Sequence, residues 1–216
     1  MEGGVAATVA RAGLRITFGV AIIAALILSS TAKAGLIGTG SAAYCDPTSA
    51  QPFAAWGDSA SYAHLLNGGF EAGTTGWTLS GGARVVSGNE PFFVDGNKKD
   101  SHSLLLPAGS SAYSSTVCFA LGDWHLRFLM RNVGSSSGQL HIQVVVPSLL
   151  GGVLAILDGG TVSSGGAWTP SPRLELLLCN VTSLLGTKAV AFRFMPVGYG
   201  AAYQIDDTYL DPWVDR

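Results

Sequence analysis

The sequence lacks an excess of charge of either sign. Lys and Arg together number 12, Asp and Glu number 14, and charged residues make up 12% of the 216-residue chain. Apart from Lys98 and Lys99 there is no basic cluster, and aromatic residues do not alternate with basic ones. Because nucleic-acid binding depends on basic patches that neutralise phosphates, we expect no nucleic-acid partner.

Motifs of common catalytic centres are also missing. The four histidines, His64, His102, His125 and His141, do not have the spacing of a zinc site. The stretch 134–138 reads Gly-Ser-Ser-Ser-Gly, but it joins two predicted strands, whereas a nucleophile elbow needs a strand-to-helix turn. No predicted strand carries the paired carboxylates of a glycoside hydrolase. An enzyme is therefore the less favoured class, open only as a hydrolase whose site is assembled from distant loops.

Long hydrophobic runs are absent except for one near the N-terminus. Two arginines precede an apolar stretch from Ile16 to Leu28, and Ala32-Lys33-Ala34 follows it. A charged start, an apolar core and a small-residue cleavage site form a secretory signal, so we expect residues 1–34 to be a signal peptide. An uncleaved anchor is the alternative, but the run is shorter than the roughly 20 residues that cross a bilayer. The expected location is secreted and extracellular, without stable membrane insertion after cleavage.

Cysteine is scarce, with only Cys45, Cys118 and Cys179 in the chain. An exported chain meets oxidising conditions in which cysteines pair, and the count allows one disulfide and one free thiol. We predict a Cys45–Cys118 disulfide that ties an N-terminal arm, residues 35–61, to the remaining domain, residues 62–216. Closing a loop of about 70 residues would stabilise the fold by roughly 4 kcal/mol in the chain-entropy model.

Short strands with alternating polarity fill the predicted mature chain. In Trp124–Arg131 the even-numbered residues are apolar and the odd-numbered positions include His125, Arg127 and Arg131, and Gln139–Pro147 alternates in the same way. Glycine-, serine- and proline-rich turns separate about nine or ten such strands, and no helical periodicity of useful length occurs. The pattern predicts an all-β fold, a two-sheet antiparallel β-sandwich of the jelly-roll type.

Two stretches at opposite ends of this domain resemble a known family. NGGFEAGTTGWTLSGGARVV, which begins at Asn67, and AYQIDDTYLDP, which ends at Pro212, look like the terminal strands of the galactose-binding-like jelly roll used by many carbohydrate-binding modules. PFAAWGDSASY and VSGNEPFFV also resemble a group of secreted actinobacterial proteins. The first resemblance implies the jelly-roll fold and carbohydrate binding, and the second supports the extracellular location without adding an activity.

The same resemblance implies a metal site. Members of the family commonly hold a structural calcium ion with a glutamate and a terminal aspartate that match Glu71, Asp206 and Asp207 in this sequence. Ca²⁺ takes six to eight oxygen ligands, and glycine-rich turns can direct backbone carbonyls at it. The alternative interpretation is that Glu71 and Asp206 accept hydrogen bonds from backbone amides and only close the turn.

Outward-facing polar residues of several predicted strands form a candidate ligand-binding face. If these strands lie in one sheet, their side chains line one concave surface, to which Tyr113 adds an aromatic ring. The predicted ligand-binding residues are His125, Arg127, Arg131, His141, Gln143, Arg193 and Tyr113. We therefore expect a secreted, non-catalytic protein that binds carbohydrate such as cell-wall or extracellular glycan. The alternative from a different class is a purely structural protein, in which these are ordinary solvated residues.

Overall fold

The computed structural model describes residues 1, 49–118, 125–148, 151–176 and 189–211. The chain divides into two units, residues 1–33 and 34–216, and every described strand belongs to the second. The predicted signal peptide apart from Met1, most of the arm, and Cys45 and Cys179 lie outside the described residues, so the signal and the disulfide stay predictions. In the described ranges no helix has the length and apolar character needed to cross a membrane.

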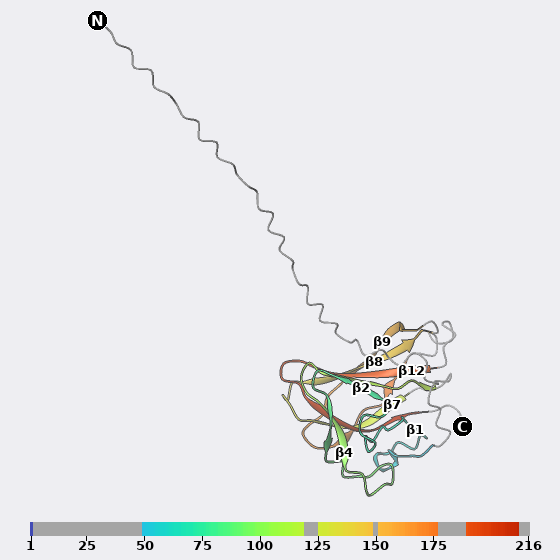
Figure 1. Ribbon diagram of the computed structural model, residues 1–216. Helices are drawn as coiled ribbons and strands as arrows, with labels where there is room; N and C mark the ends of the chain where they lie inside the picture. The colour runs from blue at the N-terminus through green and yellow to red at the C-terminus, as the bar shows by residue number, and fades with distance from the viewer. Residues whose placement is uncertain (2–48, 119–124, 149–150, 177–188, 212–216) are drawn as a thin grey trace. The chain divides into compact units, whose positions relative to one another are not determined.

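The first sheet contains the strand that closes the described chain. Its central strand β13 (Tyr203–Leu210) lies between β7 (His125–Asn132) and β4 (His102–Leu106) (Figure 1). Shorter strands complete it: β3 (Arg84–Ser87) beside β4, β1 (Ala63–His64) beside β13, and both β10 (Thr169–Pro170) and β11 (Leu174–Glu175) beside β7.

The second sheet follows the order β2, β5, β12, β8, β9. Its strands are β2 (Trp77–Ser80), β5 (Ser111–Ser114), β12 (Ala189–Val197), β8 (Gln139–Pro147) and β9 (Val153–Val162), with β6 (Val117–Cys118) paired to β12. Every named strand pair in both sheets is antiparallel. The predicted all-β, two-sheet antiparallel sandwich is therefore confirmed.

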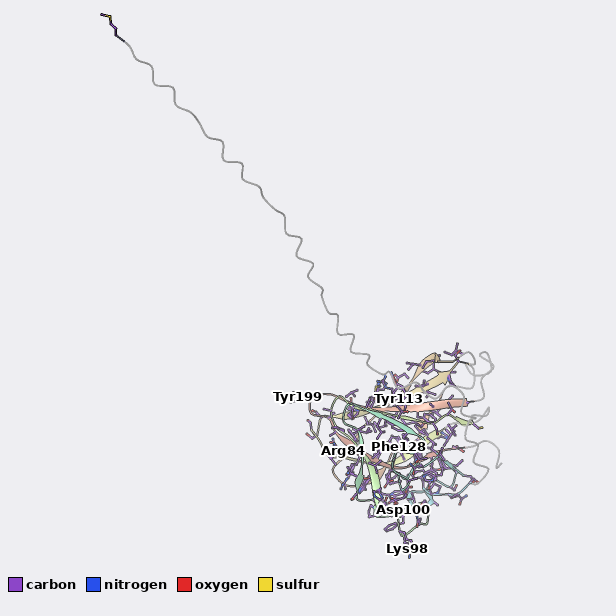
Figure 2. All side chains as sticks on the ribbon, in the orientation of Figure 1. Arg84, Lys98, Asp100, Tyr113, Phe128 and Tyr199 are labelled. Atoms are coloured by element: carbon purple, nitrogen blue, oxygen red, sulfur yellow. The ribbon has the colours of Figure 1, made fainter. Side chains whose placement is uncertain are left out.

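The main core fills the space between the two sheets. Side chains alternate across each strand, so Phe128 of β7 meets Phe194 of β12 edge to face, with ring centroids 5.3 Å apart. Trp77 opens β2 and packs against Phe70 at 4.9 Å, and both belong to this core. Figure 2 shows Phe128 inside the domain. The aromatic residues of the NGGFEAGTTGW stretch thus anchor the fold.

A second, smaller core lies on the outer side of the first sheet. The described part of the arm contains a 3₁₀ turn, η1 (Ala54–Trp56), and places Phe53 and Tyr62 against Leu129 of β7 and Tyr209 of β13. All eight residues of β13 are consequently buried. Residues 49–62 therefore cover an outer sheet face that the strand alternation alone would leave in solvent.

Candidate functional site

The seven predicted ligand-binding residues lie on two different sheets. Three of them, His125, Arg127 and Arg131, belong to β7 of the first sheet. The other four belong to β5, β8 and β12 of the second sheet: Tyr113, His141, Gln143 and Arg193. The structure thus divides the predicted stripe into two groups instead of bringing it together on one concave surface.

The group on the first sheet is engaged in contacts within the protein. Arg127 is only 7% exposed, lies over the ring of Phe53 at 4.3 Å, and donates two hydrogen bonds to the carbonyl oxygen of Ser171, at 3.1 and 2.8 Å. Its guanidinium also forms an ion pair with Asp58 of the arm, with Nη1 and Oδ2 2.5 Å apart. Because every one of these contacts is internal, Arg127 is a structural residue and is not available to a ligand.

The two neighbours of Arg127 on this face also have internal partners. Arg131 donates from Nε to the amide oxygen of Gln204 and lies over the ring of Trp168 at 5.1 Å. His125 Nδ1 is 3.0 Å from Asp211 Oδ2. The alternation of β7 correctly placed these residues on the outer side, but it carried no information about what covers that side.

Three of the four residues on the second sheet, Tyr113, Gln143 and Arg193, belong to a continuous row across five strands. The strand register places Thr78 opposite Tyr113, Tyr113 opposite Arg193, Arg193 opposite Gln143, and Gln143 opposite Asp158. Residues in register on antiparallel neighbours project to the same face, so the row runs perpendicular to the strands. With strands about 4.8 Å apart, it is about 19 Å long. We call these five residues the polar row.

Members of the polar row contact one another. The guanidinium of Arg193 lies over the Tyr113 ring, 4.9 Å from its centroid, and Nη1 donates to Gln143 Oε1 at 3.3 Å. At the end of the row, Asp158 Oδ1 is 2.9 Å from His141 Nε2. The backbone N–H of Gly160 and the imidazole of His141 lower the pKa of Asp158. Sequence reasoning missed Asp158, although its place two residues after Ile156 on a strand with alternating burial was a usable signal.

An apolar row lies beside the polar row on the same outer face. Ala191 pairs with Val145, and Val145 pairs with Ile156, which is 50% exposed on the edge strand β9. Ala191 and Val145 are themselves fully buried, so the outer face of the second sheet offers donors, acceptors, one aromatic ring and exposed apolar surface at Ile156. This is the mixture that small-molecule and sugar sites use.

A separate cluster of carboxylates lies beside β13, the central strand of the first sheet. Asp95, Asp100 and Asp207 each place a carboxylate oxygen within 4.8 Å of those of the other two. Asp207 is fully buried and has a φ of 46°, beside a register shift in the pairing of β13 with β7. Figure 2 shows Asp100 near Lys98, well apart from Tyr113. We call Asp95, Asp100 and Asp207 the acidic cluster.

Within the described residues neither carboxylate oxygen of Asp207 has a donor in hydrogen-bonding geometry, although the acid Glu90 lies beside it and interacts with it electrostatically. The nearest basic atom is His64 Nε2, 3.5 Å from Oδ1. A Cβ atom at Gly69 would lie 3.0 Å from that same oxygen, so glycine keeps the space beside the carboxylate open. A buried acceptor with no donor is costly unless another charge compensates it.

The electrostatics around the acidic cluster reflect this missing compensation. Burial, assisted by the charge of Asp95, raises the pKa of Asp100 to about 7. Burial and the neighbouring charge of Asp207 raise the pKa of Asp206 to about 9. Burial also raises the pKa of Glu90. Among the described residues no lysine or arginine forms an ion pair with any of these acids.

The structure distinguishes the three predicted metal ligands from one another. Glu71 Oε1 accepts the backbone N–H groups of Ser101 and His102, at 2.8 and 2.6 Å. Asp206 accepts the backbone N–H groups of Glu90 and Asp207. Glu71 and Asp206 therefore accept backbone hydrogen bonds, as the alternative to a metal site predicts. Of the three acids, only Asp207 is left without a donor among the described residues.

Asp95 and Asp100, which complete the acidic cluster, were not identified from the sequence. The sequence feature that could have identified them is a short loop with an aspartate at each end and a glycine inside it, Asp95-Gly96-Asn97-Lys98-Lys99-Asp100. Three carboxylates, one of them buried without donors, fit a hard cation that prefers oxygen ligands, such as Ca²⁺.

Comparisons with known proteins find structural neighbours of low sequence identity. No family model and no curated protein matches the chain. One similar structure is TmCBM61 in complex with β-1,4-galactotriose, 18% identical over 68% of this chain and 97% of that one, with a TM-score of 0.43. Another is the CBM22-1 xylan-binding domain of Paenibacillus barcinonensis Xyn10C, 17% identical over 69% and 94%, with a TM-score of 0.45.

A third neighbour is the K1 cleaved adhesin domain of Lys-gingipain from Porphyromonas gingivalis, 12% identical over 66% of this chain and 94% of that one, with a TM-score of 0.40. Two of the three are carbohydrate-binding modules, in agreement with the resemblance seen in the sequence. Likenesses this distant carry no functional argument, and the sandwich architecture rests on the strand pairing of this chain itself.

Proposed function

We propose that the protein is a secreted, non-catalytic carbohydrate-binding protein and that the polar row is its binding surface. The observation that carries the proposal is the register that aligns Tyr113, Arg193, Gln143 and Asp158 across neighbouring strands. Sugars present many hydroxyl groups, each both donor and acceptor, and a row of amide, guanidinium and carboxylate groups can pair with them. A row of about 19 Å suits an extended oligosaccharide better than a single sugar.

The two outer faces of the sandwich differ in a way that supports this choice. Residues 49–62 cover the first sheet and bury Arg127, whereas the residues of the polar row remain partly or fully exposed. Their backbones are held by strand pairing on both sides at β5, β12 and β8. A rigid scaffold lowers the entropy lost when a ligand binds.

Binding of the secreted chain to a glycan array tests this function, followed by titration of the best ligand. We expect Gln143→Ala to weaken binding by about tenfold, the effect of losing one or two hydrogen bonds. Thr161→Ala, on β9 outside the polar row, is the matched control and should bind as the parent does. Uniform absence of binding across the array would instead leave the purely structural alternative.

The hydrolase alternative has two candidate constellations. Ser101 Oγ and Glu71 Oε2 each lie 3.0 Å from His102 Nδ1. In a catalytic triad the nucleophile and the acid use different imidazole nitrogens, so this arrangement is a hydrogen-bonded turn. The acidic cluster contains Asp207, which is fully buried and does not face a substrate. Both observations support a non-catalytic role.

A structural Ca²⁺ ion held by the acidic cluster is part of the proposal. Asp95, Asp100 and Asp207 would supply carboxylate oxygens, and the ion would supply the permanent positive charge that no lysine or arginine of the described chain places beside Asp207. Such an ion joins the loop that contains residues 95–100 to β13. Its role is to stabilise the fold, and we assign it no part in chemistry.

Secretion and the Cys45–Cys118 disulfide rest on the sequence. The hydrophobic run, the small-residue cleavage site and the cysteine count support them. N-terminal sequencing of protein recovered from the medium should give Gly35 as the first residue. Peptide mapping without reduction should recover Cys45 linked to Cys118; a Cys118–Cys179 peptide would contradict that pairing.

A further inference from the structure

We infer that the polar row selects glycans that carry carboxylate groups, such as chains of uronic acid residues. The inference rests on the proposed function and makes its ligand class more specific. Arg193 carries it, because this arginine occupies the central strand of the second sheet, in the middle of the polar row. Its neighbours on both sides are uncharged, Tyr113 on β5 and Gln143 on β8.

Among the described residues, no acid compensates the positive charge of Arg193. Arg193 forms no ion pair in the part of the chain that the structure describes. The one carboxylate of the polar row, Asp158, lies two strands away, which corresponds to about 10 Å, and it already pairs with His141 and the N–H of Gly160. The central position of the row therefore attracts a negative group.

The guanidinium is also oriented and incompletely bonded. Its plane is held by the Tyr113 ring and by the 3.3 Å hydrogen bond to Gln143 Oε1, while Nε is buried and has no acceptor. Arginine presents its donors as a planar fork that matches the two oxygens of a carboxylate. A bound carboxylate would accept hydrogen bonds from the outer Nη groups, since the buried Nε is closed to a ligand.

The position of Arg193 also makes this surface less suited to sugars that carry no charge. Neutral sugars gain affinity in protein sites by packing on an open aromatic ring, and Tyr113 is the aromatic residue of the polar row. One face of that ring is occupied by the guanidinium. Charge-assisted hydrogen bonds, which are about twice as strong as neutral ones, are what this part of the surface offers instead.

Calorimetric titration of the secreted chain with tetragalacturonate and with its carboxyl-reduced neutral counterpart tests the inference. We expect the acidic ligand to bind at least about tenfold more tightly, and the difference to shrink as salt is raised because exposed charges are screened. Arg193→Gln should remove the preference. Arg84→Gln is the matched control, since Arg84 is an exposed arginine on β3 of the other sheet, and it should keep the preference.

The outcomes separate the inference from the proposed function. Equal binding of the two ligands, or a preference that survives in Arg193→Gln, would overturn the selectivity for carboxylates and leave carbohydrate binding intact. Binding of neither ligand, together with a blank glycan array, would overturn both. Circular dichroism of Arg193→Gln shows whether a loss of binding comes from unfolding, and Arg193→Lys, which keeps the charge but not the fork, should retain only part of the preference.

Discussion

Two buried carboxylates of the domain, Asp58 and Asp207, have opposite surroundings. Asp58 is 3% exposed, forms ion pairs with Arg127 and Arg173, and accepts a hydrogen bond from Tyr62. Burial alone would raise the pKa of Asp58, but the hydrogen bonds from Arg173, Tyr62 and Arg127 outweigh burial and hold that pKa well below its ordinary value. Asp207 is equally buried and has no donor in hydrogen-bonding geometry among the described residues.

The difference shows two ways of keeping a charge inside a fold. At Asp58 the chain supplies its own counter-charges, from β7 and from the segment before β11, and uses them to fasten the arm. At Asp207 the described chain supplies no lysine or arginine but only the imidazole of His64 at 3.5 Å, and the neighbouring Asp206 has a pKa raised to about 9. The first site is complete without a ligand, and the second is completed by a cation in our proposal.

The largest expected effect comes from removing a counter-charge at Asp58. Arg127→Leu leaves this buried carboxylate with one guanidinium and removes the bonds to Ser171. We expect the free energy of unfolding, measured by urea denaturation, to fall by about 3 kcal/mol or more. Arg84→Leu is the control, because Arg84 is exposed and bonds only to the carbonyl of Gly82. A loss no larger than that of the control would show that the arm is held by apolar packing alone.

The second largest effect on stability is expected from adding or removing calcium. A ligand that binds only the folded state adds about 2.7 kcal/mol at a hundredfold excess over its dissociation constant, so calcium should raise the Tm of the parent chain and EDTA should reverse the rise. Asp207→Asn should abolish the response and, without calcium, should be at least as stable as the parent because a repulsive charge is gone. An unchanged Tm in EDTA would contradict a tightly held ion.

The two sites should also respond to pH in opposite directions. The folded-state pKa of Asp58 lies below its unfolded value of 3.8, so its stabilisation is complete above about pH 4 and is lost as the pH falls further. The folded-state pKa of Asp206, about 9, lies above 3.8, so in calcium-free solution stability falls as the pH rises from about 4 towards 9.

Urea denaturation from pH 3 to pH 8 in EDTA separates the two contributions. Asp206→Asn should flatten the decline on the neutral side, and Asp58→Asn should reduce the loss on the acid side. If Asp206→Asn left the neutral slope unchanged, Asp206 would be ionised in the folded protein, and the comparison between the sites would fail.

The smallest effect on stability is expected at an exposed carboxylate that, like Asp58, pairs with a basic side chain. Asp158 pairs with His141, but its side chain is 78% exposed, and water screens such pairs. Asp158→Asn should leave the urea midpoint unchanged within error. A clear destabilisation would mean that the pairing itself, and not burial, determines what a carboxylate contributes.

Sequence patterns predicted the fold well because alternation is a local property. The apolar positions of Trp124–Arg131 and the Asn67–Trp77 turn required only neighbouring residues to be interpreted, and the sandwich follows from many such strands. The same local information placed Arg193 and Gln143 on an outer face, where the structure finds them.

The candidate sites were harder to predict because they depend on contacts between distant segments. Nothing in β7 indicates that Phe53 and Asp58, about seventy residues earlier, cover Arg127. Asp95 and Asp100 belong to a loop without periodicity, and only the fold brings them to Asp207. Assignment of strands to the two sheets, which divided the predicted ligand stripe, is likewise a property of topology.

The order of the strands also has a consequence for how the chain reaches its folded state. β12 and β13 are the last two strands described, yet each is the central strand of its sheet. While the earlier residues emerge from the ribosome or cross a membrane, β3 can pair with β4 and β8 with β9, but the halves of each sheet have no strand between them. Such long-range pairing makes folding slow, so this chain completes its two sheets only after residue 210 is free. A chaperone that binds extended, apolar strands would find one edge of β8 unpaired until β12 is free, and one edge of β7 unpaired until β13 is free.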